Sequence, residues 1–97
     1  MTLSELLASE QPGPVFRPFF KAQNGRLTAI RVRKGEVIKE HKSPVPAVLL
    51  VLEGAVRYEQ PGENIVHQLG ALEYTEIPPD TIHQVIAETD AYCMLVQ

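Results

Sequence analysis

From Val15 onwards, glycine, proline and asparagine divide the chain into short runs rich in β-branched and aromatic residues. The dividing residues are Asn24-Gly25, Gly35, Pro44, Pro46, Gly54, Pro61-Gly62, Gly70 and Pro78-Pro79. Glycine supplies turn conformations and proline removes a backbone donor, so such residues end strands. Short runs at this spacing are typical of antiparallel sheets closed into a sandwich or barrel. The spacing therefore predicts an all-β fold.

Nine strands are expected between these breaks, after one short helix. The expected strand ranges are 15–21, 26–33, 36–42, 47–52, 55–59, 64–69, 74–77, 83–88 and 91–96. Leu3, Leu6 and Leu7 have helical spacing behind a candidate cap at Thr2 or Ser4, which predicts a helix within the first ten residues. The sequence has no repeat or linker. We expect a single domain of residues 1–97, with helix and arm over 1–14 and a β-barrel over 15–97.

Side-chain alternation indicates what covers the strands. The apolar run 47–52 does not alternate, so this strand is expected to be covered on both faces, by the barrel interior and by another layer or subunit. Ile30 and Val32 alternate with Arg31 and Arg33, and these two arginines are expected to be solvated.

Three turn residues carry conformational expectations. Gly54 and Gly70 are expected to adopt positive φ, which glycine tolerates because it has no Cβ. Asp80, in the turn Pro78-Pro79-Asp80-Thr81, is expected to take the left-handed conformation that aspartate tolerates better than most residues.

Length and charge exclude several classes of function. Ninety-seven residues form one core, which excludes an enzyme with separate cofactor and substrate domains. Nine basic against twelve acidic residues give a net charge of −3, so no nucleic-acid partner is expected. No apolar run approaches the roughly 20 residues that span a membrane. Acidic Glu5 near the N-terminus and the lone Cys93 favour a cytoplasmic location.

The three histidines, His41, His67 and His83, are the main candidates for chemistry. His41 and His83 lie at the ends of expected strands, and strand ends of a closed barrel bring distant side chains to one cavity. His67 shares a face with Ile65 and Leu69, and it lies inside the barrel only if that face is the inner one.

The segments around His41 and His83 resemble the two sequence motifs of the cupins. The first reads Gly35-EVIKE-His41-Lys42-Ser43-PVP-Ala47-VLLVLE-Gly54, and the second reads Gly70-ALEYTEI-Pro78-Pro79-Asp80-Thr81-Ile82-His83, with Ala87 four positions later. The resemblance covers about residues 25 to 97 and is nearest to small bacterial cupins with His-x-Ser/Ala-Pro in the first motif. It implies a double-stranded β-helix, the jelly-roll or cupin barrel.

The resemblance also implies where a metal would bind. In metal-dependent cupins, three histidines and one glutamate hold the ion; here His41 and His83 are kept, while Ser43 and Ala47 replace the other two ligands. A hydroxyl is a poor ligand for iron, manganese, nickel or zinc, and alanine is none. On an undistorted strand Lys39 shares a face with His41, and its ammonium group would repel a cation. We therefore expect an incomplete site.

Other side chains are candidates for the pocket because tyrosines often lie at pocket rims, although strand aromatics also pack in cores. Cys93 and Met94 alternate, so one of them faces inward. Cys93 is expected to be a small buried thiol rather than a nucleophile. The complete set of pocket candidates is His41, Ser43, Tyr58, Tyr74, His83, Tyr92 and Met94.

Phe16, Phe19 and Phe20 flank Pro18, which restricts this segment to a sheet edge. An edge rich in phenylalanine requires covering, so it is expected to close the barrel or to pack on a partner. In related cupins such segments often join a dimer interface, and we expect a homodimer.

Three functions follow from this sequence. The favoured one is a small-molecule-binding barrel with a degenerate metal site. The alternative is a metal-dependent enzyme, a dioxygenase or an isomerase, with His41 and His83 as ligands. A structural module with a filled interior is the third. Catalysis stays open, because a histidine pair also serves as general acid and base without a metal.

Overall fold

The structure, a computed structural model, describes all 97 residues. Its elements in chain order are α1 (Leu3–Leu6), β1 (Val15–Ala22), β2 (Gly25–Val32), β3 (Val37–His41), β4 (Ala47–Glu53), β5 (Val56–Gln60), the 3-10 helix η1 (Pro61–Glu63), β6 (Ile65–Leu69), β7 (Tyr74–Ile77), β8 (His83–Ala87) and β9 (Ala91–Val96). The nine expected strands are all present, each end within one residue of its expected position. No helix of the chain has the length and apolar character needed to cross a membrane.

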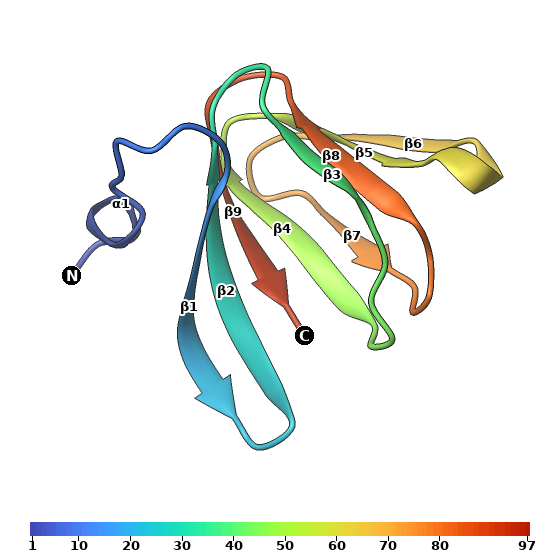
Figure 1. The fold of residues 1–97 in the computed structure, drawn as a ribbon, viewed down its shortest axis with the longest axis horizontal. Helices are drawn as coiled ribbons and strands as arrows, with labels where there is room; N and C mark the ends of the chain where they lie inside the picture. The colour runs from blue at the N-terminus through green and yellow to red at the C-terminus, as the bar shows by residue number, and fades with distance from the viewer.

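The strands form two antiparallel sheets that face each other (Figure 1). Sheet A has the order β1-β2-β9-β4-β7, and sheet B has the order β3-β8-β5-β6. After β2 the chain passes repeatedly between the sheets, with β4, β7 and β9 in one and β3, β5, β6 and β8 in the other. This winding is that of a double-stranded β-helix, so the expected all-β jelly-roll with a short N-terminal helix is confirmed.

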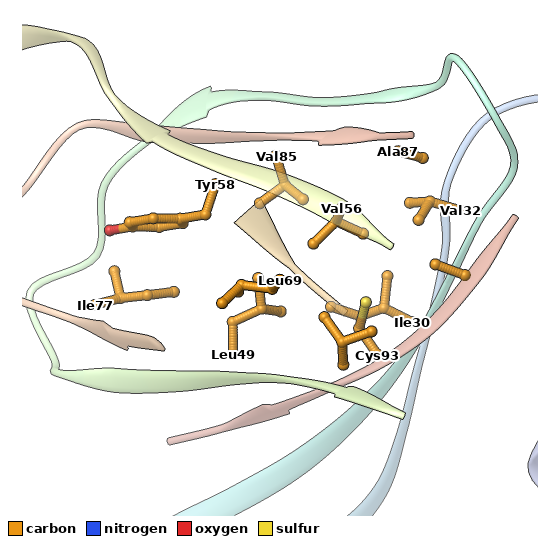
Figure 2. Close-up of a cluster of buried hydrophobic side chains, with 12 residues drawn as sticks. Ile30, Val32, Leu49, Val56, Tyr58, Leu69, Ile77, Val85, Ala87 and Cys93 are labelled. Carbon is orange, nitrogen blue, oxygen red and sulfur yellow. The ribbon is translucent and has the colours of Figure 1, made fainter. Parts of the chain in front are cut away.

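The core lies between the sheets, and Figure 2 shows its side chains converging from both. It consists of Ile30, Val32, Leu49, Val51, Val56, Tyr58, Leu69, Ile77, Val85, Ala87, Ala91 and Cys93. Inward-facing residues alternate along each strand, as the pleat requires. Cys93 is thus the inward member of the Cys93–Met94 pair, and burial raises the pKa of its thiol to about 12.

A second cluster covers part of the outer face of sheet A. Leu7, next to α1, packs on Val15 of β1 and Ala29 of β2. Arg31 lies beside it, and its Nη1 donates to the carbonyl oxygens of Leu7 at 2.8 Å and Ser9 at 3.2 Å. The expectation that Arg31 is solvated is wrong, because the N-terminal segment folds over its guanidinium group; Nε and Nη2 are buried without a partner.

The turns confirm two of the three conformational expectations. Gly54 has φ +87°, and a Cβ there would overlap the Asp90 carbonyl oxygen and lie 2.9 Å from the Ala91 Cα. Asp80 has φ 55°. The expectation for Gly70 is wrong: the left-handed residue of the β6–β7 turn is Leu72, with φ 69°.

The apolar strand β4 lies inside sheet A, between β9 and β7. Its inward residues Leu49 and Val51 are buried in the core. Its outward residues Val48, Leu50 and Leu52 are only half-buried, because α1 packs on β1 and β2 instead. The core therefore covers the inner face of β4, as the sequence predicts. No other element of the chain packs on its outer face.

Candidate functional site

A β-bulge in β3 places the exposed His41 beside the buried His83, at one wall of a cavity between the sheets. β3 pairs with β8, and Ile38 lies opposite Val85 while His41 lies opposite His83, so β3 holds one residue more than β8 between these pairs. A bulge of this kind shifts the alternation of side chains by one residue, so residues after it point to the face opposite to the one that a regular strand would give. Ile38 and His41 consequently line the same cavity, and the exposed Lys39 lies on the opposite face from Ile38. The premise of an undistorted strand, with Lys39 beside His41, is wrong.

Backbone carbonyl groups fix the tautomers of both histidines. His41 Nδ1 lies 2.8 Å from the Lys39 carbonyl oxygen, and His83 Nδ1 lies 2.9 Å from the Thr81 carbonyl oxygen. A carbonyl oxygen only accepts, so each Nδ1 carries the proton and donates it. In the neutral rings each Nε2 therefore holds a free lone pair. The two ring centroids are 4.2 Å apart, with the planes tilted by 58°.

The electrostatics keep His83 neutral. Burial lowers the pKa of His83, and the nearby His41 lowers it further, while the hydrogen bond to the Thr81 carbonyl opposes both. An imidazolium ion in this position would lose its hydration and repel a second one 4.2 Å away. At neutral pH, then, the buried ring of the pair offers an acceptor rather than a positive charge.

The pair begins a row of four rings across the inner face of sheet B. His41 on β3, His83 on β8, Tyr58 on β5 and His67 on β6 follow the strand order of the sheet. The Tyr58 centroid lies 5.7 Å from that of His83 and 6.0 Å from that of His67. His67 lies on the face of Leu69, a core residue, so its face is the inner one.

Two hydrogen bonds anchor the far end of this row. The Tyr58 hydroxyl donates to Gln60 Oε1 at 2.8 Å, and both residues are buried. Burial, with the negative charge of Glu63, raises the pKa of Tyr58 and keeps its hydroxyl a donor. His67 Nδ1 lies 3.0 Å from Thr75 Oγ1, a bond that joins β6 of sheet B to β7 of sheet A. Figure 2 shows the Tyr58 ring lying over Ile77, and both side chains are buried.

A small cavity of about 30 Å³ lies between the sheets at the histidine pair. Its walls are formed by Phe16, Ile30, Ile38, His41, Leu49, Ile77, His83, Val85 and Leu95. A space of this size accommodates one or two water molecules. Two of the wall residues are exposed: Phe16, which comes from the edge strand β1 and is 44% exposed, and His41.

The structure brings together three of the seven pocket candidates: His41, His83 and Tyr58. Ser43 lies in the β3–β4 loop, where its hydroxyl accepts from Val45 N at 3.3 Å and its carbonyl accepts from Asp80 N at 2.7 Å.

Tyr74, Tyr92 and Met94 lie on the outer face of sheet A. Tyr92 packs against the cluster around Leu7, and Tyr74 is 63% exposed. Met94 lies on β9 opposite Ala29 of that cluster, on the other face from Cys93. These three side chains therefore do not meet the histidines.

Gln60 and Thr75 are buried polar residues that the sequence analysis did not select. Each alternates with inward apolar residues, Gln60 with Tyr58 and Thr75 with Ile77. A polar residue at an inward position of a strand was the signal that could have found them.

The donor set falls short of a divalent metal site. No three or more His, Cys, Asp or Glu side chains cluster anywhere in the chain. Ala47, at the position where the resemblance places a glutamate, packs against the core. Two imidazoles without a carboxylate neither complete the coordination of a catalytic metal nor offset its charge. These residues do not fit a catalytic metal ion.

Comparison with solved structures identifies the architecture. A cupin superfamily protein from Desulfitobacterium hafniense superposes with a TM-score of 0.85 at 12% identity, over 100% of this chain and 87% of that one. A cupin-2 domain protein from Shewanella frigidimarina gives 0.81 at 15% identity, over 100% and 92%. A conserved protein with a double-stranded β-helix domain from Klebsiella pneumoniae gives 0.84 at 18% identity, over 99% and 85%.

The chain has the cupin fold. No protein-family model and no curated protein matches the sequence. At these identities the similarity shows the cupin fold alone, and the chemistry of the barrel depends on its own residues.

Proposed function

We propose that this cupin barrel binds a small molecule between its sheets, in a degenerate metal site where His41 and His83 hold the ligand. The observation that carries the proposal is the pair of free Nε2 lone pairs at one wall of an otherwise apolar cavity. Binding sites of small molecules are commonly apolar with a few fixed polar groups, and this cavity has that composition.

The lining indicates the chemistry of the ligand. Of its nine residues seven are hydrophobic, the other two are the histidines, and none is Lys, Arg, Asp or Glu. Neutral Nε2 atoms accept hydrogen bonds, so the ligand has to donate. An anion would find no positive charge here, and burying it would be costly. The ligand class is therefore a small uncharged molecule, largely apolar, with one or two O–H or N–H donors, such as a phenol or an alcohol.

Entry requires Phe16 to move. The cavity of about 30 Å³ is smaller than any such ligand, and Phe16 borders it from the edge strand β1. An edge strand has one paired neighbour and is more easily displaced than a central one. Phe16 thus acts as the cover of the site, and removing its ring should open the cavity.

A metal-dependent enzyme, a dioxygenase or an isomerase, is the second candidate. One observation favours it: Nδ1–H donation to a backbone carbonyl is also the arrangement that orients metal-ligating histidines. The absence of a third ligand near His41 and His83 counts against it.

The test is a binding titration with phenol, benzyl alcohol and benzoate, followed by two-dimensional NMR of the labelled protein. We expect phenol and benzyl alcohol to shift resonances around the cavity and benzoate to bind at least about tenfold more weakly at pH 7.5. His41→Ala and His83→Ala should each abolish binding, and Phe16→Ala should strengthen it. His67→Ala is the matched control, since His67 lies on the same row but outside the cavity wall.

Metal content separates the two candidates. Elemental analysis of protein purified without a metal-affinity tag should give far less than one equivalent of iron, manganese, nickel or zinc. Near-stoichiometric metal that is lost in His41→Ala and His83→Ala would overturn the proposal in favour of the enzyme. Equal binding of phenol by the wild type and both alanine variants would contradict the proposed site. The single thiol of Cys93 fits the reducing cytoplasm, where we expect the protein to act.

A further inference from the structure

We propose that a hollow on the outer face of sheet A binds a small zwitterion of the α-amino acid type, with the carboxylate of the ligand on Arg31 and its ammonium group beside Glu53 and Asp90. Arg31 lies near the end of β2, Glu53 ends β4, and Asp90 directly precedes β9. The hollow is separate from the histidine cavity, because no residue lines both. The inference therefore does not rest on the ligand proposed above.

The strand register assembles this hollow from three neighbouring strands. Arg31 of β2 lies opposite Tyr92 of β9, and Tyr92 lies opposite Glu53 of β4, so the three residues form one transverse row. Arg33 and Asp90 lie directly beyond the last pair of the β2–β9 ladder. These five residues line a hollow of about 350 Å³, a volume within the range of small-molecule sites.

The guanidinium group of Arg31 holds a pair of donors without an acceptor. Its Nη1 donates to the carbonyl oxygens of Leu7 and Ser9, whereas Nε and Nη2 are buried without a partner. No other buried side-chain nitrogen or oxygen atom in the chain lacks a partner. Two parallel N–H groups on one edge of a guanidinium match the two oxygens of a carboxylate. Because a buried donor without an acceptor is costly, a carboxylate would stabilise both atoms at once.

The charges around the hollow select a zwitterion. The ion pairs of the chain are those of Arg57 with Glu59 and Glu88 on sheet B, so the charged groups of the hollow are not paired with one another. Two arginines and two carboxylates line the hollow, and their formal charges sum to zero. A simple anion would be repelled by the two carboxylates, whereas a zwitterion meets the opposite charge at each of its ends. A phosphate group, with nearly two negative charges, fits this balance less well than a carboxylate does.

The middle of the row suits the ammonium group of such a ligand. The backbones of Arg31 and Glu53 are two strand spacings apart, roughly 10 Å, so a ligand that contacts both side chains lies over Tyr92. An aromatic ring attracts a cation placed over its face. The carboxylate of Glu53 is exposed and makes no hydrogen bond, and Asp90 uses Oδ1 to accept from Lys34 N at 2.8 Å. Both acidic groups thus keep an oxygen that can accept from an ammonium group.

Binding should also move the N-terminal segment. Nε and Nη2 of Arg31 are shielded from water, so a carboxylate reaches them only when the groups that cover them shift. Leu7 and Ser9 lie against the same guanidinium group through their carbonyl oxygens. The backbone amides of residues 7–9 should therefore respond to the ligand together with the Arg31 side chain.

NMR titration with L-alanine, propionate and ethylamine at constant ionic strength tests the ligand class. Propionate lacks the ammonium group of L-alanine, and ethylamine lacks its carboxylate. We expect L-alanine to shift the Arg31 Nε–H resonance and the amides of residues 7–9, and the other two compounds to bind at least about tenfold more weakly. No shift of the Arg31 Nε–H resonance at about 50 mM L-alanine would overturn the proposal. Propionate that binds as tightly as L-alanine would overturn the assignment to a zwitterion.

Two conservative variants test the two ends of the site. Arg31→Lys keeps the charge and a donor for the Leu7 carbonyl but removes the paired N–H groups, so it should weaken L-alanine binding at least about tenfold. Glu53→Gln removes one negative charge from an exposed side chain, so it should weaken L-alanine binding about fivefold without weakening that of propionate. Glu40→Gln is the matched control, since Glu40 is an exposed glutamate outside the hollow.

A third variant separates this site from the histidine cavity. His83→Ala should leave L-alanine binding unchanged, because His83 does not line the hollow. Loss of L-alanine binding in folded His83→Ala would contradict a separate site. Unchanged binding in both Arg31→Lys and Glu53→Gln would refute the site itself. Far-UV circular dichroism verifies that each variant is folded.

Discussion

The hydrogen bond between Tyr58 and Gln60 anchors the row of four rings on sheet B. Its contribution to stability can be measured by a double-mutant cycle. Tyr58 is fully buried, Gln60 is nearly so, and the bond is 2.8 Å long. Tyr58→Phe keeps the ring but leaves the buried Gln60 oxygen without a donor, at a cost of about 1–3 kcal/mol. Gln60→Met keeps the volume but leaves the tyrosine hydroxyl without an acceptor, at a similar cost.

The double variant leaves no orphaned polar group, so it should lose about 1 kcal/mol less than the sum of the single losses. The measurement is urea denaturation followed by circular dichroism, because the chain has no tryptophan. Protein concentration is held constant, since a dimer links stability to concentration. Tyr92→Phe is the control: its hydroxyl has no hydrogen bond, and we expect a change below about 0.5 kcal/mol. Single losses that add to within about 0.3 kcal/mol would refute the coupling.

Three further predictions concern stability, each checked by the same denaturation assay. Gly54→Ala should lower the free energy of unfolding by about 3 kcal/mol or more, because the alanine would combine a positive φ with a backbone clash. Gly35→Ala, at φ +86° in open space, should lower it by only about 1–2 kcal/mol. As pH rises above about 9, the unfolded chain loses the Cys93 proton that the folded chain keeps, so stability should fall by about 1 kcal/mol by pH 10, and Cys93→Ala should abolish this component. As pH falls below about 6.5, the unfolded chain protonates His83 before the folded chain does, so the free energy of unfolding should decrease. His83→Gln should reduce this pH dependence.

Strand positions were predictable from the sequence because glycine and proline interrupt it wherever the chain turns. Alternation also placed His67 on the face of Ile65 and Leu69 but left open whether that face is the inner one, and the burial of Leu69 in the core shows that it is. The conformation at Gly54 followed from its place directly after a strand. At the β6–β7 turn the same reasoning chose Gly70 and missed Leu72, because composition identifies a turn but not which of its residues takes the left-handed conformation.

Properties that depend on contacts distant in sequence were not predictable. Arg31 alternates as a solvated residue does, yet Leu7 and Ser9 cover it from 24 and 22 positions away. Tyr74, Tyr92 and Met94 are as apolar as core residues but lie on the outer face of sheet A. Alternation alone does not show which face of a strand points into the barrel.

The bulge between Ile38 and His41 is the feature that most determines the chemistry of the site. No residue in this segment predicts a bulge. It places His41 opposite His83, so that both rings line the cavity. The Lys39 carbonyl, two residues before, accepts the Nδ1 proton of the same ring. With Lys39 itself on the outward face, no ammonium group enters the cavity, and the walls contain no other charge. A regular strand would have aimed His41 elsewhere. One inserted residue therefore accounts for two adjacent imidazoles at the wall of an otherwise apolar cavity, which is the composition that favours a hydrogen-bond-donating, uncharged ligand over an anion or a metal ion.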